Sequence, residues 1–426
     1  GIADEVTLKK IDEILKSPLQ FGKRNSNTVQ LKKDLAKIGY PVPGNGTNYF
    51  GKETEKKVKQ FQKDYGLPVS GIVDEVTQAK IKELLKTNRL VNYNISLSQA
   101  LKMQMKASPQ TDKKTYAYVS KDNIDKNNKV KVSILNVRSG PGENNDVIGK
   151  LSKGTKVSIL DEINGWYAIE YKNSEWVHAI TKDVRYYLNP NNFKNDQVRR
   201  FQFLDLNRPS AATVTQLNNY LRGKGTLSGQ GQAFKDAGLT HRVNEIYLIS
   251  HAILETGHGT SLLASGTIQV GEISNNRYVV VLPKANNTKD IYIVQNFNNS
   301  NRKATKNNSY NLKNVKLTKI YNMFGIGAYD SNPNVYGAVK AYQEGWNTPR
   351  KAIIGGAQFI GGNYIKAGQN TLYKMRWNPD AMANLKYATH QYATDIAWAY
   401  KQSSLIYNLY KEIGVNTYHF EIPVYK

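Results

Sequence analysis

Hydrophobic residues recur at helical spacing through residues 26–86, in three segments separated by turn-forming residues. A loop rich in proline and glycine, residues 40–46, follows the first segment, and Asp74 is placed to open the third. The residues that define the three helices are Val29, Leu31 and Leu35 on the first; Thr54, Val58, Phe61 and Tyr65, which share one face of the second; and Val76, Ile81, Leu84 and Leu85 on the third. The pattern predicts a small three-helix domain.

The connector that follows, residues 87–115, shows one short helical stripe. Ser96 and Gln99 have the spacing of a capping box. The apolar residues of the stripe are Leu97, Ala100, Leu101 and Met105. We expect this connector helix to pack on a neighbouring domain rather than to form a ligand site.

Between residues 116 and 186 the hydrophobic period changes to two, which is typical of strands. Turns rich in glycine separate the alternating runs at residues 139–142, 153–155 and 164–165. The strand positions are Val130, Val132 and Ile134; Val157 and Ile159; and Trp166, Ala168 and Glu170. Short strands at this spacing predict a small β-barrel, with at least one of Trp166 and Trp176 in its core.

Residues 187–426 are mostly helical in pattern, with an interruption at about 266–320. Two runs there, 278–282 and 290–294, predict a β-hairpin, and the polar stretch 296–311 is expected to be mobile. The chain as a whole is predicted to be a multidomain α+β protein. The expected limits are 1–25, 26–86, 87–115, 116–186 and 187–426.

Composition narrows the class of protein. The net charge of +25 favours attraction to polyanions such as nucleic acid, anionic lipid or teichoic acid. No nucleic-acid-binding motif is present, and no apolar run of about 18 residues could span a membrane. The absence of cysteine excludes disulfides and thiol catalysis, and is compatible with a secreted protein. We expect a monomer without a cofactor or metal.

The first residues repeat a later segment. The motif at 1–7, Gly-Ile-Ala-Asp-Glu-Val-Thr, recurs at 71–77 as Gly-Ile-Val-Asp-Glu-Val-Thr. We therefore expect residues 1–25 to be the tail of a preceding copy of the helical module, and any signal peptide to lie outside the sequence.

The strongest chemical signal is the sequence Leu254-Glu255-Thr256-Gly257-His258-Gly259, which ends an apolar helical run. Glycine is costly inside a helix, so the helix is expected to end here and to bring Glu255 to a bend that a cleft can reach. A partly shielded carboxyl group at such a place is how glycosidases hold a general acid.

The motifs around Glu255 resemble the glucosaminidase domain of Gram-positive autolysins, glycoside hydrolase family 73, over about residues 186–426. The matching segments, in chain order, are Asn244–His251, Leu254–Ser261, Asn322–Asp330, Ala352–Ala357, Gln369–Pro379 and His390–Asp395. The resemblance implies a mainly α, lysozyme-like catalytic domain with a β-hairpin lobe beside the cleft. It also implies cleavage between N-acetylglucosamine and N-acetylmuramic acid in peptidoglycan.

The two upstream domains carry resemblances of their own. Residues 50–51, 60–62 and 66–74 resemble the three-helix peptidoglycan-binding domain, and residues 135–142, with Gly165-Trp166-Tyr167, resemble a bacterial SH3 domain. The implied partners are glycan strands and stem peptides, with teichoic acids reached through the basic surface. The implied location is outside the cell, on the wall.

A glycosidase commonly uses a second carboxyl group, and here it is not obvious. Glu272 is the preferred candidate and Asp290 the next, both on the expected hairpin. If the substrate's 2-acetamido group acts instead, a tyrosine could orient it; Tyr329, Tyr373 and Tyr392 are the candidates, and Tyr392 is our choice. The other matched residues expected to contact substrate are Glu245, Phe324, Tyr329, Asp330, Tyr373, Arg376, Trp377 and Asp395. Glu245 could equally form a structural ion pair, and Phe324 could lie in the core. Asp330 and Asp395 could be buried network residues.

Other functions remain open. A muramidase or lytic transglycosylase could use the same scaffold, and a wall-binding protein with an inactive catalytic domain would keep the motifs. The positions of His251, Glu255 and His258 raise a zinc amidase, but their spacing is not His-Glu-x-x-His. We therefore predict no metal site.

Overall fold

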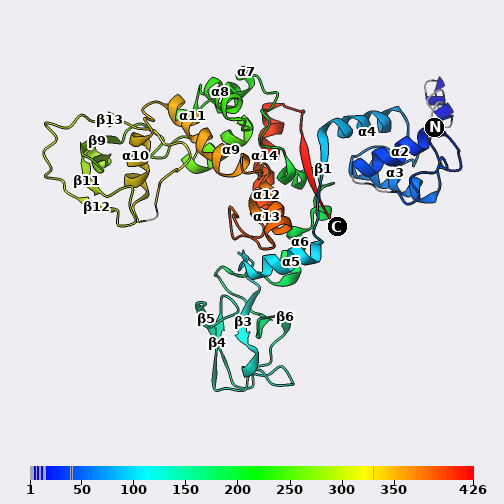
Figure 1. Ribbon diagram of the computed structural model, residues 1–426, viewed down its shortest axis with the longest axis horizontal. Helices are drawn as coiled ribbons and strands as arrows, with labels where there is room; N and C mark the ends of the chain where they lie inside the picture. The colour runs from blue at the N-terminus through cyan, green and yellow to red at the C-terminus, as the bar shows by residue number, and fades with distance from the viewer. Residues whose placement is uncertain are drawn as a thin grey trace. The chain divides into compact units, whose positions relative to one another are not determined.

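The computed structural model describes residues 4, 5, 7, 8, 11, 12, 16–38, 40, 42–329 and 331–426, without the side chains of Lys37, Asp64 and Lys86. The chain forms two compact units, coloured along the sequence in Figure 1. The first unit contains residues 1–204, 371–404 and 419–426, and the second contains residues 205–370 and 405–418. Much of the expected repeat tail at 1–25 lies outside the described residues.

Three helices follow one another near the start of the first unit, as predicted: α2 (Ser26–Lys37), α3 (Lys52–Asp64) and α4 (Glu75–Thr87). Asp74 caps α4 by accepting a hydrogen bond from the backbone N–H of Thr77 at 2.8 Å. Leu35, Val58, Phe61 and Ile81 of the predicted residues lie in one buried cluster, whereas Val76 is 53% exposed.

The connector holds two strands besides its helix. The helix, α5 (Leu97–Lys106), has the predicted capping box between Ser96 and Gln99. Strand β1 (Asn88–Tyr93) runs parallel to β14 (Phe420–Tyr425) at the other end of the chain. This strand was not predicted, because the strand that it pairs with lies more than three hundred positions away.

The predicted strand region forms a five-stranded antiparallel sheet in the order β5-β4-β3-β7-β6. Its strands are β3 (Tyr116–Ser120), β4 (Ile134–Arg138), β5 (Val147–Ser152), β6 (Ile159–Ile163) and β7 (Trp166–Glu170). Trp166 packs against a buried cluster, whereas Trp176 is 49% exposed. Strand β2 (Gln110–Thr111) pairs with β8 (Val177–His178). The segments by which the chain enters and leaves this sheet are therefore hydrogen-bonded to each other.

The rest of the first unit is helical: α6 (Thr181–Leu188), α12 (Leu372–Trp377), α13 (Pro379–Leu385) and the start of α14 (Trp398–Ile413). Helix α5 packs against α6 and α13, as the apolar stripe of the connector predicted. Ala100 and Leu101 of that stripe are buried.

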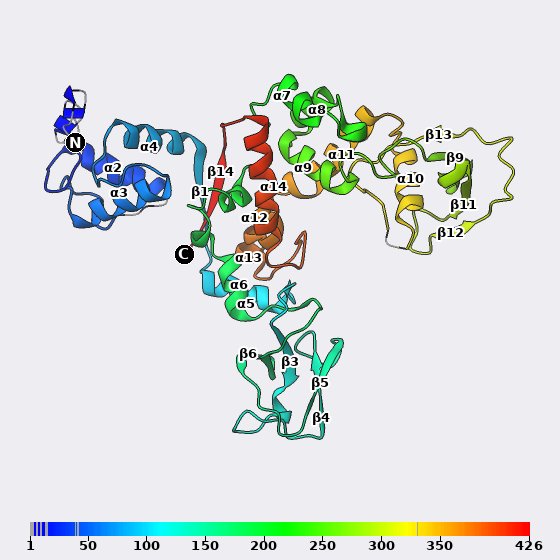
Figure 2. The ribbon, with the colours of Figure 1, turned by 180° about the vertical axis from the view of Figure 1, so that it is seen from behind.

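The second unit combines helices with a second five-stranded sheet (Figure 2). The helices are α7 (Val214–Leu221), α8 (Gly231–His241), α9 (Glu245–Thr256), α10 (Pro333–Gln343) and α11 (Pro349–Ile360). The sheet order is β12-β11-β10-β9-β13, with β9 (Gln269–Ser274), β10 (Arg277–Pro283), β11 (Lys289–Gln295), β12 (Lys303–Lys306) and β13 (Thr318–Lys319). Helix α10 packs on this sheet.

The predicted hairpin is confirmed as β10 and β11, with Val280 opposite Tyr292. The sheet is larger than the expected lobe because three further strands extend it. One of them, β12, lies inside residues 296–311, where we expected mobility, and Tyr292 pairs with Lys306. That prediction is wrong because β11 supplies this polar strand with backbone partners.

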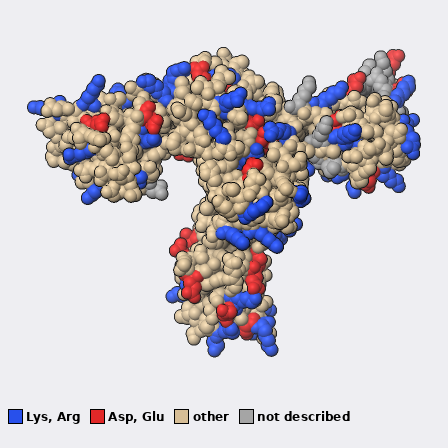
Figure 3. Space-filling view, viewed as in Figure 1, with Lys and Arg blue, Asp and Glu red and all other residues tan. Residues whose placement is uncertain are grey.

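On the face drawn in Figure 3, basic residues are spread out rather than gathered in one patch. Lysine and arginine side chains occur throughout that face, with aspartate and glutamate among them. Among the described residues, no helix is long and apolar enough to cross a membrane.

Candidate active site

Helix α9 ends where the sequence predicted and carries Glu255 on its last turn. Gly257 adopts the left-handed conformation (φ 52°, ψ 55°), and its N–H bonds to the carbonyl of Ile253. His258 is also left-handed (φ 63°), so it leaves the helix direction at once. The chain therefore bends two residues after Glu255.

Thr256 fixes this bend from within. Its hydroxyl donates to the carbonyl of Ala252 at 2.5 Å and accepts from the N–H of Gly259 at 2.7 Å. Gly259 is required for another reason: a Cβ there would lie 2.5 Å from the carbonyl oxygen of Lys224. Thr226 closes this contact, since its N–H bonds to the carbonyl of Gly259 at 3.2 Å. The turn is thus held by the hydrogen bonds of Thr256 within it and by that of Thr226 outside it.

Glu255 itself stays partly open to solvent, with 39% of its side chain exposed. One carboxylate oxygen lies 3.6 Å from Nε2 of His251, one turn earlier on α9. The other faces Gly325, where a Cβ would lie 3.0 Å from it. The carboxyl group therefore sits between an imidazole and a backbone wall, with one side free.

The backbone turn that faces Glu255, residues 322–327, is called the Gly325 wall below. Asn322, which was not singled out from the sequence, holds this turn in place. Its side-chain oxygen accepts from the N–H groups of Phe324 and Ile326, and its amide donates to the carbonyls of Ile326 and Gly337. Gly325, inside this turn, has φ 64°. The available signal was the pair of glycines at 325 and 327, in a segment otherwise made of hydrophobic residues.

Phe324 is buried, with 5% exposed, and its ring lies 5.8 Å from that of His251. The expected substrate contact of Phe324 is therefore corrected: it packs behind His251, which is the core alternative. Tyr329 is 43% exposed and has the guanidinium of Arg302 4.0 Å above its ring. Asp330 lies outside the described residues.

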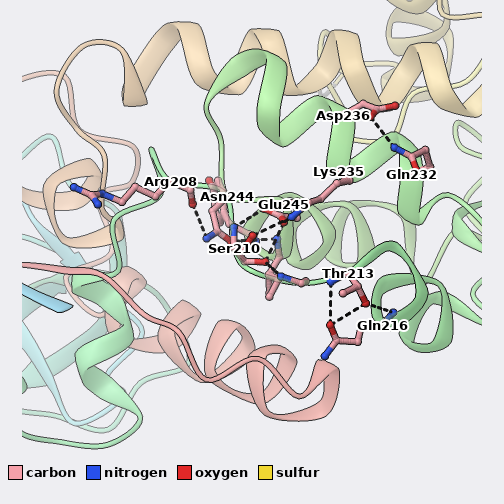
Figure 4. A network of polar contacts seen from close by, with 12 residues as sticks. Arg208, Ser210, Thr213, Gln216, Gln232, Lys235, Asp236, Asn244 and Glu245 are labelled. Carbon is pink, nitrogen blue, oxygen red and sulfur yellow. Dashed lines mark hydrogen bonds and ion pairs between the residues drawn. The ribbon is translucent and has the colours of Figure 1, made fainter. Parts of the chain in front are cut away.

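Glu245, at the other end of α9, is fully buried and cannot contact substrate, which corrects that expectation. Figure 4 shows its polar contacts. Its carboxylate accepts from the N–H and hydroxyl of Ser210 at 2.7 and 3.0 Å, and pairs with Lys235 at 2.8 Å. Burial without partners would be costly for a carboxylate, and these contacts compensate for it. Glu245 forms the structural ion pair that we weighed as its alternative.

The carboxylates expected on the hairpin differ from each other. Glu272 is exposed on β9, opposite Tyr278 of β10. Asp290 pairs with Lys306 at 2.8 Å and with Lys284 at 3.2 Å. The hydrogen bond from Lys306 lowers the pKa of Asp290 to about 2, with further help from Asn308 and Lys284. Asp290 is thus ion-paired with two lysines, whereas Glu272 is exposed to solvent.

Three matched residues of the first unit are buried, which corrects their expected role in lining a sugar cleft. Tyr373, Arg376 and Trp377 are exposed by 1% or less. Tyr373 donates to the carbonyl of Leu188 at 2.5 Å. Burial lowers the pKa of Arg376 to about 9, against the effect of Asp395, so the guanidinium is charged at neutral pH. Stacking on a sugar needs an exposed ring, which Trp377 does not offer.

Asp395 also lies in this core. It accepts from the N–H of Ala397 at 2.9 Å and pairs with Lys401 at 2.8 Å, so it is the network residue weighed earlier rather than a substrate contact. Tyr392 nearby is 37% exposed and stacks on Trp398 with ring centres 4.6 Å apart. Tyr392 is therefore more exposed than Tyr373, Arg376, Trp377 and Asp395.

The metal alternative finds no geometry to support it. Among the residues that the structure describes, no three histidine, aspartate or glutamate side chains gather as metal ligands would. His258 is exposed beyond the bend, and only His251 lies beside Glu255.

Three protein-family models match the chain. A putative peptidoglycan-binding domain matches residues 24–81, a bacterial SH3 domain matches residues 133–181, and the family described as mannosyl-glycoprotein endo-beta-N-acetylglucosaminidase matches residues 231–411. The last match includes Glu255 and residues 256–259, which form the turn after it. The chain thus has a three-domain architecture of helices and sheets.

Similar proteins carry matching names. Beta-N-acetylglucosaminidase of Bacillus subtilis (strain 168) is 42% identical over 81% of this chain, and bifunctional autolysin of Staphylococcus aureus (strain MSSA476) is 41% identical over 59% of it. The chain spans 33% and 17% of the lengths of those relatives. The crystal structure of Major Bifunctional Autolysin is 30% identical, with 80% of this chain and 98% of that one covered and a TM-score of 0.46. Residues 231–411 thus match the glucosaminidase family, and regions that match a peptidoglycan-binding domain and a bacterial SH3 domain precede them in the chain.

Proposed function

We propose that this protein is an endo-β-N-acetylglucosaminidase that cleaves the β-1,4 bond between N-acetylglucosamine and N-acetylmuramic acid in peptidoglycan. Glu255 is the general acid. The observation that carries the proposal is its place: a partly exposed carboxyl group on the last turn of α9, set between His251 and the Gly325 wall, within the matched glucosaminidase domain.

In the proposed reaction the carboxyl group of Glu255 gives its proton to the glycosidic oxygen as the bond to the anomeric carbon breaks. The positive charge that develops on the sugar is then stabilised from the opposite face of the ring by a second group, which is either a carboxylate or the substrate's own 2-acetamido group. Water completes the reaction by adding to the anomeric carbon, and its proton returns to Glu255. The rigid turn around Thr256 keeps the acid in place throughout, so little reorganisation is needed.

Two routes are possible, and they differ in the group that acts together with Glu255. Glu272 would act as a carboxylate in the two-carboxyl route, whereas Tyr392 would orient the substrate's own 2-acetamido group in the substrate-assisted route. The roles of both residues are predictions from the sequence. A Glu272→Gln variant without activity would establish the first route. Normal activity in Glu272→Gln together with a loss in Tyr392→Phe would establish the second.

We also propose a role for the domains that precede the glucosaminidase domain. The sheet β3–β7 would close as an SH3-like barrel, and the glucosaminidase core would be lysozyme-like. Both upstream domains would hold a secreted, monomeric enzyme on the wall by contacts to glycan strands and stem peptides, which raises its local concentration. The charge of +25 would add a salt-sensitive attraction to teichoic acids.

Mass spectrometry of peptidoglycan digests, after borohydride reduction, tests the proposal. Reduced N-acetylglucosamine ends, produced by the wild type and absent with Glu255→Gln, would support both the bond cleaved and the acid. Reduced muramic ends would assign the chain to the muramidases, and anhydro-muramic ends to the lytic transglycosylases. Intact glycan with released stem peptides would indicate an amidase, and no product at all would indicate a wall-binding protein.

A further inference from the structure

The loop that carries Tyr392, residues 389–397, joins α13 to α14 in the first unit. Its own domain holds it at a few points. The N–H of Tyr392 bonds to the carbonyl of Met375 at 2.9 Å. Arg376 donates from below to the carbonyls of Thr394 and Asp395, at 2.9 and 2.7 Å. We call this segment the Tyr392 loop.

The connector supplies a second set of contacts from one buried side chain. Gln104, on α5, is fully buried. Its amide nitrogen donates to the carbonyl of Trp377 at 3.0 Å and to the sulfur of Met382 at 3.2 Å. Its amide oxygen accepts from the side chain of Gln391 at 2.8 Å. Gln391 immediately precedes Tyr392, so Gln104 bonds to the loop at the position next to Tyr392.

A second connector residue binds the far end of the loop. The N–H of Gln110 donates to the carbonyl of Thr394 at 2.9 Å, and its carbonyl accepts from the N–H of Ile396 at 2.9 Å. The hydroxyl of Thr394 also bonds to the side-chain oxygen of Gln110 at 3.0 Å. Through these backbone bonds, Gln110 of the connector and Asp395 of the loop form a parallel β-bridge.

A shared cation reinforces the same junction. Lys401, on α14, lies 2.7 Å from Asp112 of the connector and 2.8 Å from Asp395 of the loop. The connector thus bonds to the Tyr392 loop on both sides of Tyr392, from a part of the chain that lies outside the matched residues 231–411.

We propose that Gln104 and Gln110 are positioning residues of the hydrolase, and that the connector is a working part of its catalytic machinery rather than a tether. Through Gln391 and Thr394 they hold the loop in the conformation that presents Tyr392. This inference rests on the proposed function, because it concerns a residue of the proposed reaction. It departs from the modular view in which residues 1–185 only deliver the enzyme to the wall.

The test uses the full chain with Gln104→Leu, which keeps the volume but cannot bond to Gln391. Lys102→Ala is the matched control, because it lies on the exposed side of the same helix. Hydrogen exchange of residues 389–397 reports the loop, and kcat and KM on soluble glycan fragments report catalysis. We expect faster loop exchange and a fall in kcat on the order of tenfold with Gln104→Leu. KM should stay within about twofold, because the acetamido contact acts on the reacting centre.

Two further variants protect the test against simple misfolding. Thr394→Val removes the exposed bond to Gln110 without entering the core, and should give the same changes at about two- to threefold size. Gln391→Leu combined with Gln104→Leu should be no worse than Gln104→Leu alone, since both changes remove the same bond between the two residues. Lys102→Ala should match the wild type in every readout.

Wild-type kcat and loop exchange in Gln104→Leu would overturn the proposal. So would a fall in kcat with unchanged loop exchange, because the effect would then travel by another route. If Gln104→Leu does not fold, wild-type behaviour of Thr394→Val overturns it in the same way. If the wild type releases no glycan product, the proposed function fails first, and hydrogen exchange alone still decides whether the connector orders the loop.

Discussion

Helix α9 carries a carboxylate at each end, and the two have opposite surroundings. Glu245, at the first turn, is fully buried and bonded to Ser210 and Lys235. Glu255, at the last turn, has 39% of its side chain exposed, and one of its carboxylate oxygens lies 3.6 Å from Nε2 of His251. One helix thus places one carboxylate for stability and another for chemistry.

The helix dipole sharpens this contrast. The N-terminal end of a helix favours negative charge and the C-terminal end disfavours it, each by about 0.3–1 kcal/mol at an exposed site. Glu245 occupies the favourable end and Glu255 the unfavourable one. A residue kept where it does not help stability is a candidate for function, since natural proteins break local rules mainly at their sites.

The largest expected effect is that of Glu255→Gln on catalysis. Loss of a general acid should lower kcat by about 10²–10⁴-fold. The midpoint of thermal unfolding should stay the same or rise slightly, because the change removes a charge from the disfavoured end of α9. Calorimetry and glycan hydrolysis on the same preparation check both. A variant that remains active, or one that loses activity only by unfolding, would contradict the contrast.

Glu245→Ala should show the reverse. Removing one partner of a buried ion pair should lower the free energy of unfolding by about 3 kcal/mol, near the low end for such pairs because Lys235 is 21% exposed. The fraction that stays folded should keep its kcat within a few-fold. Denaturant unfolding measures the loss.

The matched control for Glu245 removes the pair altogether. Glu245→Leu combined with Lys235→Met should cost less than the sum of the single changes, since neither charge is left alone. Additive losses would show that the pair contributes no coupling, and equal kcat losses in Glu245→Ala and Glu255→Gln would end the contrast.

Glycines around the acid offer a finer comparison. A Cβ at Gly325 would lie 3.0 Å from a carboxylate oxygen of Glu255, whereas a Cβ at Gly257 meets nothing closer than 3.7 Å. Both residues have positive φ, so alanine costs about 1–2 kcal/mol at each. Only Gly325→Ala should also lower kcat, by about tenfold, because it displaces the acid. Unfolding and hydrolysis of the two variants, side by side, separate strain from displacement, and equal kcat values would show that the Gly325 wall does not position Glu255.

Much of this fold could be predicted from the sequence, because the information was local. The capping box at Ser96, the end of α9 at Gly257 and the hairpin around residues 278–294 each depend on nearby residues. Strand β1 could not be found, because its partner β14 lies at the other end of the chain.

The site was predicted in part for the same reason. The position of Glu255 follows from its own helix and turn, but burial depends on the whole fold. Arg376 and Trp377 stand in a matched motif and still lie in the core, where Arg376 donates to the carbonyls of Asp395 and Thr394 in the Tyr392 loop. Gln104 could not be connected to that loop from the sequence, because Gln391 lies 287 positions away.

Asp290 should give the smallest effect, and it extends the contrast to the sheet. Its pKa is about 2 in the folded chain, against an ordinary value of 3.8, chiefly because of the hydrogen bond from Lys306. A carboxylate with a lowered pKa stabilises the fold above the unfolded value and loses that contribution as the pH falls through the folded value. The ion pairs of Asp290 should therefore weaken between about pH 4 and pH 2. In Asp290→Asn, the dependence of the unfolding midpoint on pH should become shallower in that window, while kcat at neutral pH stays near the wild-type value. A large fall in kcat in this variant would instead assign Asp290 the second catalytic role that its two lysines argue against.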